Sequence, residues 1–174
     1  MQHLKNKLKS SLIGAKKIAI LGVGSELRAD DIAGILAAQE LEKASKQISG
    51  SIDIKIFLGY TAPENLSGEI KKYGPTHVII IDTADIGKKP GEVALFTPDD
   101  AGGISFSTHK LPIKVLASYL TQSFDCKVII IGIQPKTLDF GKPVSGEVKE
   151  AVKSVAKTLE EVIINKTETL KDNE

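Results

Sequence analysis

The chain has 174 residues, and this length predicts one domain with an ordinary hydrophobic core. Its 23 Lys and Arg residues nearly cancel 22 Asp and Glu residues, and the formal net charge of +1 speaks against a nucleic-acid partner. The single cysteine, Cys126, excludes an intrachain disulfide framework and is expected to be a small buried side chain. Because the sequence has no secretory-signal pattern and no run of membrane-spanning length, we predict a cytoplasmic protein without membrane insertion.

The predicted elements follow the apolar pattern along the chain. Residues 1–16 are expected to form a basic arm or helix, and residues 165–174 a frayed tail. In between, the pattern predicts a strand at 17–22, a helix at 32–43, a strand at 52–58, a helix at 63–72, strands at 77–82 and 91–97, a helix at 109–122, a strand at 127–132 and a helix at 145–164. Asp30 and Asp31 precede the first long helix and are interpreted as its capping residues.

The spacing around the fourth strand decides the expected topology. Only residues 83–90 separate the strand at 77–82 from the strand at 91–97, whereas a parallel crossover needs a dozen or more residues. The fourth strand should therefore run antiparallel to the third, at an edge. We predict an α/β fold, a three-layer α/β/α sandwich around a five-stranded, mostly parallel sheet whose strand four is antiparallel.

A glycine pair after the first strand raises the question of nucleotide binding. Gly22-Val-Gly24 resembles the start of a dinucleotide-binding fingerprint, but the third glycine would fall at Leu27. The second strand also ends at Leu58, where a ribose-binding acid is expected. Nucleotide binding is therefore disfavoured, and the glycines are expected to allow a tight turn.

Three polar side chains fall where a doubly wound sheet presents its ligand site. Asp31 lies in the connection leaving the first strand, Asp82 ends the strand Val-Ile-Ile-Ile-Asp, and His109 begins the helix before the last strand. These positions meet at the C-terminal edge of the sheet, where open α/β folds bind ligands. Taken singly, Asp31 could cap a helix and His109 could be structural.

Two carboxylates and one imidazole form a mixed oxygen and nitrogen ligand set. Such a set suits Zn, Ni, Mn or Fe and leaves coordination positions open for water or substrate. We therefore predict that Asp31, Asp82 and His109 bind a metal. Asp85 and Glu64 lie near the same predicted edge and are candidates of second rank.

The sequence resembles the [NiFe]-hydrogenase maturation endopeptidases. The matching stretches occur in the family's order from residue 17 to about residue 160. They are Ile-Leu-Gly-Val-Gly-Ser-Glu-Leu-Arg-Ala-Asp-Asp-Ile-Ala-Gly34, Thr61-Ala-Pro-Glu-Asn65, Val78-Ile-Ile-Ile-Asp-Thr-Ala-Asp85, Pro90-Gly-Glu92, Pro98-Asp-Asp100, Ser107-Thr-His-Lys-Leu-Pro112 and Gly132-Ile-Gln-Pro135.

The resemblance implies that Asp31, Asp82 and His109 are the family's metal ligands. It also implies a sheet with an antiparallel fourth strand. The implied activity is removal of a C-terminal extension from the [NiFe]-hydrogenase large-subunit precursor after nickel insertion. In that case the substrate carries the nickel, and the isolated protein is expected to hold no tightly bound metal.

The chain departs from the family's pattern in two loops. Ala29 and Ile32 replace the glycines that usually flank the acidic pair of the first loop. Leu58 stands where an Asp commonly ends the second strand, in the stretch Leu58-Gly-Tyr-Thr61. Glu64 is the nearest acid that could compensate, so the catalytic candidates are Asp31, Asp82, His109 and Glu64.

Two other functions stay open at the level of the sequence. The first is a non-proteolytic, nickel-dependent docking factor for the hydrogenase large subunit, which would follow from the loss of an acid at Leu58. The second is a small-molecule hydrolase that uses its own metal. The metal could polarise the scissile carbonyl or activate water, or it could only position the substrate. No Ser–His–Asp or Cys–His arrangement is evident, which disfavours covalent catalysis.

Overall fold

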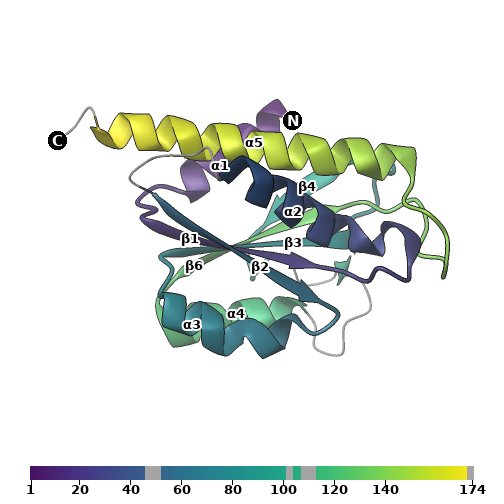
Figure 1. The fold of residues 1–174 in the computed structure, drawn as a ribbon, viewed down its shortest axis with the longest axis horizontal. Coiled ribbons are helices and arrows are strands. Elements are labelled where there is room, and N and C mark those ends of the chain that lie inside the picture. The colour runs from purple at the N-terminus through teal and green to yellow at the C-terminus, as the bar shows by residue number, and fades with distance from the viewer. Residues whose placement is uncertain (46–51, 101–103, 107–112, 172–174) are drawn as a thin grey trace.

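A computed structural model describes residues 1–45, 52–100, 104–106 and 113–171 (Figure 1). The strands are β1 (Lys17–Val23), β2 (Asp53–Tyr60), β3 (His77–Asp85), β4 (Val93–Phe96), β5 (Ser105–Phe106) and β6 (Lys127–Ile133). The α-helices are α1 (Gln2–Ser11), α2 (Ala33–Ser45), α3 (Ser67–Tyr73), α4 (Ile113–Phe124) and α5 (Gly146–Lys171). Two short 3-10 helices, η1 (Ala29–Ile32) and η2 (Pro63–Leu66), precede α2 and α3.

The main sheet has the strand order β2-β1-β3-β6-β4. The first four strands of this order are parallel, and β4 pairs antiparallel with β6 from Val93↔Ile133 to Phe96↔Ile130. The predicted antiparallel edge strand is therefore confirmed. The short strand β5 was not predicted, because two residues carry no readable period. It pairs antiparallel with the end of β3 at Ala84↔Phe106.

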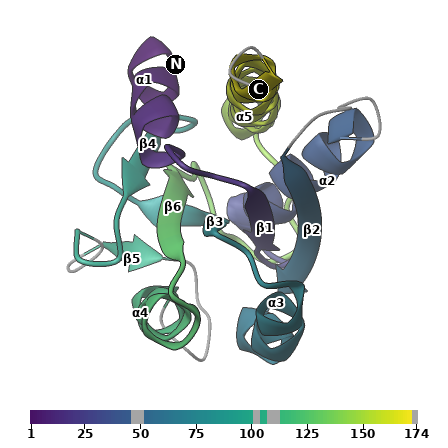
Figure 2. The same cartoon turned by 90° about the vertical axis from the view of Figure 1, so that its left-hand side faces the viewer.

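Helices cover both faces of the sheet, as Figure 2 shows in an end view. On one face α1, α2 and α5 bury Ile79 and Ile81 of β3, and on the other α3 and α4 bury Val78 and Ile80. Successive side chains of a strand point to opposite faces, so a strand with helices on both sides must be apolar throughout. The predicted three-layer α/β/α sandwich is confirmed.

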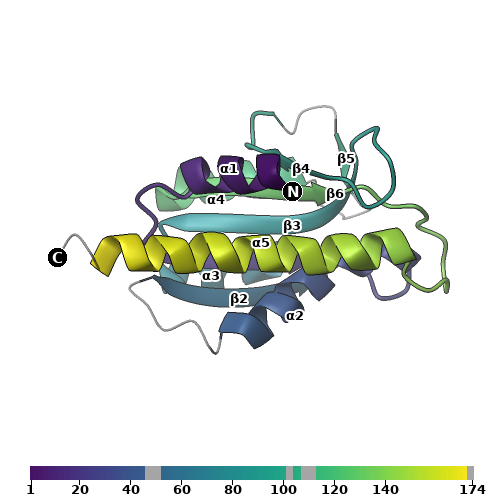
Figure 3. The same cartoon turned by 90° about the horizontal axis from the view of Figure 1, so that it is seen from above.

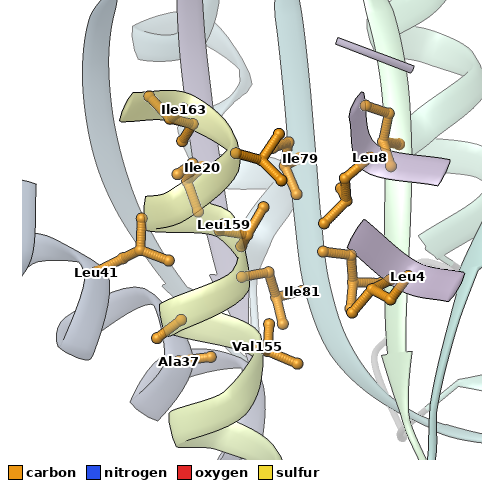
Figure 4. Close-up of a cluster of buried hydrophobic side chains, with 14 of the residues drawn as sticks. Leu4, Leu8, Ile20, Ala37, Leu41, Ile79, Ile81, Val155, Leu159 and Ile163 are labelled. Atoms are coloured by element: carbon orange, nitrogen blue, oxygen red, sulfur yellow. The ribbon is translucent and has the colours of Figure 1, made fainter. Parts of the chain in front are cut away.

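The N-terminal segment belongs to the core rather than to a free arm. Leu4 and Leu8 lie one helical turn apart on α1 and are 5% and 0% exposed. They pack beside α5 above Ile79 and Ile81, as the close-up in Figure 4 shows. Figure 3 shows α1 and α5 side by side across the sheet. Burial of each leucine is worth about 1.5–3 kcal/mol, which explains why this basic segment is helical.

Several element boundaries differ from the sequence-based ones. Strand β3 continues to Asp85 because its last residues pair with β5 and β6, so Asp82 is not the end of the strand. Helix α5 continues to Lys171, beyond the predicted end at residue 164. Helix α4 is described from Ile113, and its predicted start at 109–112 lies outside the described residues. Across the part of the chain that the structure describes, no helix is both long and apolar enough to span a membrane.

The burial of Cys126 predicts an unreactive thiol. Cys126 is 4% exposed, its Sγ lies 3.6 Å from the Leu120 carbonyl oxygen, and burial raises the pKa of the thiol. Because the thiolate is the reactive form, we expect the native protein to react with an aromatic disulfide reagent at least tenfold more slowly than the urea-unfolded protein. Absorbance of the released thiolate measures both rates. Equal rates would show that this core region opens readily.

Candidate functional site

The carboxyl ends of three parallel strands meet at one edge of the sheet. The register aligns Gly22 of β1 with Ile81 of β3, and Asp82 with Gly132 of β6. The segments between β1 and α2 and between β6 and α5 both lie at this edge, on the right of Figure 1. The sequence predicts a ligand site at this edge. The register aligns the carboxyl ends of β1, β3 and β6 there.

Asp31 and Asp82 approach each other around Thr83. The Thr83 hydroxyl donates to Asp31 Oδ1 at 3.2 Å, and the Thr83 backbone N–H donates to Asp82 Oδ1 at 2.8 Å. The second oxygen of Asp31 accepts the backbone N–H of Ser25 at 3.2 Å. Asp31 is 2% exposed and Asp82 is 0% exposed, so two acids predicted as ligands are buried and joined through a single residue.

Gly24 allows the first loop to close over Asp31. Its φ is +145°, and a Cβ at this position would lie 1.9 Å from the Asp31 carbonyl oxygen. Any side chain at Gly24 would therefore push the backbone of η1 away from the sheet. The interpretation of Gly22-Val-Gly24 as a turn element is consistent with this close approach.

Asp30 has a different role from its neighbour. It is fully buried, and its carboxylate accepts the backbone N–H groups of Lys136, Thr137 and Ser145 at 2.8, 3.1 and 2.7 Å. The Ser145 hydroxyl adds a fourth hydrogen bond at 3.0 Å. Asp30 therefore binds the segment between β6 and α5 to the first loop.

The capping role predicted for the two acids is wrong. The hydrogen bonds described for the Asp30 and Asp31 carboxylates go to Ser25, Thr83 and the segment 136–145, and η1 has no side-chain cap. Local spacing suggested a cap because an acid before a helix usually has one. The actual partners of Asp30 lie more than 100 residues away, and the single sequence holds no signal for such a contact.

Loss of the Asp30 carboxylate should destabilise the fold. In Asp30→Asn the amide group would face backbone N–H donors, and we expect the free energy of unfolding to fall by about 2–4 kcal/mol. Urea unfolding measures the change. The control is Asp139→Asn, which removes an exposed carboxylate from the same segment and should change stability by less than about 0.5 kcal/mol. Equal unfolding midpoints for the two variants would contradict the role assigned to Asp30.

Gln134 was not identified from the sequence as a site residue. Its Oε1 accepts the backbone N–H groups of Ile86 and Lys88 at 2.8 and 3.2 Å, and its Nε2 donates to Asp85 Oδ1 at 3.2 Å. Asp85 Oδ1 also accepts the N–H of Gly87. Asp85, a candidate of second rank, thus helps to hold the turn after β3. The Gly-Ile-Gln-Pro stretch at 132–135 was the available signal for Gln134.

Glu64 and Leu58 lie on the neighbouring strand and its connection. Leu58 pairs with Gly22 at the end of β2 and is half-buried, so an aliphatic group occupies the position of the family's acid. Glu64 lies in η2, and its Oε2 is buried with no hydrogen-bond partner among the described residues. Glu64 therefore stays a candidate for an acidic role.

His109 lies outside the described residues, at 107–112. Among the residues that are described, no group of three or more His, Cys, Asp or Glu side chains is arranged to hold a metal ion. The structure therefore brings together two of the three predicted ligands, Asp31 and Asp82.

Ala29, the first residue of η1, and Tyr60, the last residue of β2, adopt a left-handed backbone conformation that favours glycine. Ala29 has φ +45° and Tyr60 has φ +47°. Ala29 stands where the resemblance implies a glycine, and Tyr60 follows Gly59 in the stretch Leu58-Gly-Tyr-Thr61. A non-glycine residue in this region costs about 1–2 kcal/mol. This chain therefore stores strain in the two loops that flank the site.

Restoring a glycine should relieve part of this strain. We expect Ala29→Gly to raise the free energy of unfolding by up to about 1 kcal/mol, because the relief exceeds the added entropy of the unfolded chain. Thermal or urea unfolding measures the change. Ala156→Gly, in the interior of α5, should instead lower stability by about 1 kcal/mol or more. Equal losses in both variants would mean that the Ala29 conformation is not strained.

The fold is that of an α/β protein, and its buried acids Asp31 and Asp82 lie at the carboxyl ends of its parallel strands. Comparison with known proteins narrows this class. The family model described as HycI, hydrogenase maturation protease, matches residues 35–164. A Methanocaldococcus jannaschii protein that is provisionally named a hydrogenase maturation protease is 37% identical over 163 residues, which are 92% of this chain and 96% of that protein.

Two further relatives have assigned names. The hydrogenase 3 maturation protease of Escherichia coli K12 is 36% identical over 142 residues, covering 81% of this chain and 87% of the relative. The crystal structure of a [NiFe] hydrogenase maturation protease, HycI from Thermococcus kodakarensis KOD1, superimposes with a TM-score of 0.78 at 29% identity. That match covers 90% of this chain and 97% of the solved one. This chain belongs to the hydrogenase maturation protease family and is a hydrolase that acts on a peptide bond.

Proposed function

We propose that this protein removes the C-terminal extension of a [NiFe]-hydrogenase large-subunit precursor after nickel insertion, and that it recognises the nickel carried by that precursor. The observation that carries the proposal is the pair of buried carboxylates, Asp31 and Asp82, joined through Thr83. The pair lies at the edge where α/β folds bind ligands, in a chain that belongs to this protease family. We further propose that the reaction takes place in the cytoplasm. The single cysteine allows no intrachain disulfide, as is usual for cytosolic proteins.

Electrostatics support a cationic ligand for this pair. Two carboxylates that are buried at one edge repel each other when both are charged. A divalent cation presented by the substrate would offset this repulsion. Asp30, the third buried acid of this edge, is already satisfied by four hydrogen bonds. Of the three buried acids, we therefore assign the ligand role to Asp31 and Asp82.

The hydrogen bonds to Asp31 suit a metal ligand. Thr83 and Ser25 each donate to one of its oxygens, and such outer partners orient a carboxylate and tune its affinity for a metal. A carboxylate oxygen keeps a further lone pair after accepting one hydrogen bond. Asp31 can thus be held in place and still coordinate nickel.

We propose His109 as the third ligand because it follows β5 closely in the sequence. Phe106 pairs with Ala84, two residues beyond Asp82. In the sequence His109 follows Phe106 by three residues, and three residues of extended chain span at most about 11 Å. One imidazole and two carboxylates form a ligand set that suits Ni²⁺.

Nickel held in this way would position the substrate. The metal sits in the precursor, so its capture by the two acids and His109 fixes the cleavage segment against the sheet edge. Precise placement of a scissile bond can supply several kcal/mol of the barrier reduction. Glu64, whose buried Oε2 has no hydrogen-bond partner among the described residues, is the candidate to assist the attack of water. Since the metal arrives with the substrate, the isolated protein should hold none tightly.

The test compares nickel-loaded with nickel-free precursor. We expect wild-type protein to shorten only the nickel-loaded precursor, and His109→Ala and Asp82→Asn to lower the cleavage rate at least 100-fold because a metal ligand is lost. Mass spectrometry of the precursor measures the loss of the C-terminal extension. The matched controls are His3→Ala, on the exposed side of α1, and Asp53→Asn, at the amino end of β2.

Two outcomes would contradict the proposal. Equal processing of nickel-loaded and nickel-free precursor would exclude recognition of nickel. Tight, nickel-dependent binding that leaves the extension intact would instead favour a docking factor without proteolytic activity.

A further inference from the structure

Large apolar side chains are exposed beside the acidic pair. Phe140 is 73% exposed and Leu27 is 60% exposed, and these are the first and third most exposed of the large hydrophobic residues that the structure describes. Leu27 follows β1, and Phe140 lies in the segment between β6 and α5. Figures 1 and 3 both show these two segments at the same end of the molecule.

Backbone hydrogen bonds join the two segments. The Gly141 N–H donates to the Leu27 carbonyl oxygen at 2.9 Å, which places the residue after Phe140 directly against Leu27. Arg28 Nε donates to the Leu138 carbonyl oxygen at 3.3 Å. The backbone at Leu27 therefore lies next to the backbone that follows Phe140, and we call the part of the surface that carries these two exposed side chains the Leu27–Phe140 surface.

Hydrogen bonds and an ion pair hold the backbone segment that carries Phe140. Asp30 accepts four hydrogen bonds from the segment that carries Phe140, and its own N–H donates to the Thr137 carbonyl oxygen at 3.2 Å. Lys136 in the same segment forms an ion pair with Glu147 at the start of α5, which holds the pKa of Glu147 below its usual value. Because this backbone is already ordered, binding of a partner to its apolar side chains costs little backbone entropy, which favours recognition.

The surface is also joined to the site. The Leu27 N–H donates to Ser25 Oγ at 3.3 Å, and the Ser25 N–H donates to Asp31 Oδ2 at 3.2 Å. A polypeptide bound at Asp31 thus has Leu27 next to it. Because a protease acts on a polypeptide, the partner that we consider for this surface is its substrate.

We propose that the Leu27–Phe140 surface is a docking site for an apolar side chain of the precursor protein, next to the nickel-recognition site. This inference rests on the proposed function. An aromatic and an aliphatic side chain bury at most a few hundred Å², too little for a stable dimer, which needs about 800 Å² per partner. A small apolar anchor is, by contrast, typical of a contact that dominates the affinity for a transient partner.

The experiment measures KM and kcat separately with nickel-loaded precursor. Leu27→Ser and Phe140→Ser should each raise KM at least fivefold and the double variant at least 20-fold, with kcat within twofold of wild type. The matched control is Ile13→Ser, because Ile13 is 63% exposed but lies before β1, at the opposite edge of the sheet. Its KM should equal that of wild type. Thermal unfolding of each variant checks that the fold is retained.

A second measurement separates this inference from the proposed function. Fluorescence anisotropy of labelled precursor reports binding whether or not cleavage occurs. If wild-type protein binds the precursor without cleaving it, the proposed function fails, and weaker binding of Phe140→Ser would still support the docking site. Unchanged KM and unchanged binding in the double variant would overturn the inference. A dimeric wild-type protein that becomes monomeric in Phe140→Ser, measured by sedimentation, would also overturn it by assigning the surface to a second copy.

Discussion

The burial of three carboxylates at one edge of the sheet is the constraint on which the rest of this structure depends. An acid without compensating donors is costly in a protein interior, so each carboxylate must be supplied with hydrogen bonds or with a cation. Asp30 receives four hydrogen bonds from the segment before α5, whereas Asp31 and Asp82 share Thr83. Neighbouring acids in the chain thus divide two tasks. Asp30 holds the segment before α5, and Asp31 is the acid to which we assign a ligand.

The loops around these acids follow from the same constraint. Gly24 has no Cβ, and this allows the first loop to fold against Asp31. The hydrogen bonds of Asp30 fix the segment that carries Phe140, and Gln134 fixes the turn after β3. Ala29 and Tyr60 accept a left-handed conformation to complete the rim. Strain of this kind is common at functional sites, where surrounding contacts determine the backbone.

Much of this architecture could be predicted from the sequence, because strands buried on both faces have continuous apolar runs, as in 77–82. The short connection at 83–90 was enough to predict an antiparallel β4. The placement of Asp31 and Asp82 followed from the rule for parallel strand ends. The hydrogen bonds of Asp30, the pairing of β5 and the role of Gln134 could not be predicted, because they depend on contacts between distant residues rather than on local period. The left-handed backbone at Tyr60 could not be predicted either, because glycine rather than tyrosine is typical of that conformation.

We propose that Asp31 and Asp82, with His109, coordinate nickel that the substrate brings. X-ray absorption at the nickel edge tests it most directly, using nickel-loaded precursor alone and in complex with this protein. We predict that complex formation adds oxygen and nitrogen neighbours to the nickel at about 2.0–2.1 Å, and that the Asp31→Asn and His109→Ala complexes lack part of this shell. A nickel coordination shell that is identical in free and bound precursor would contradict the claim.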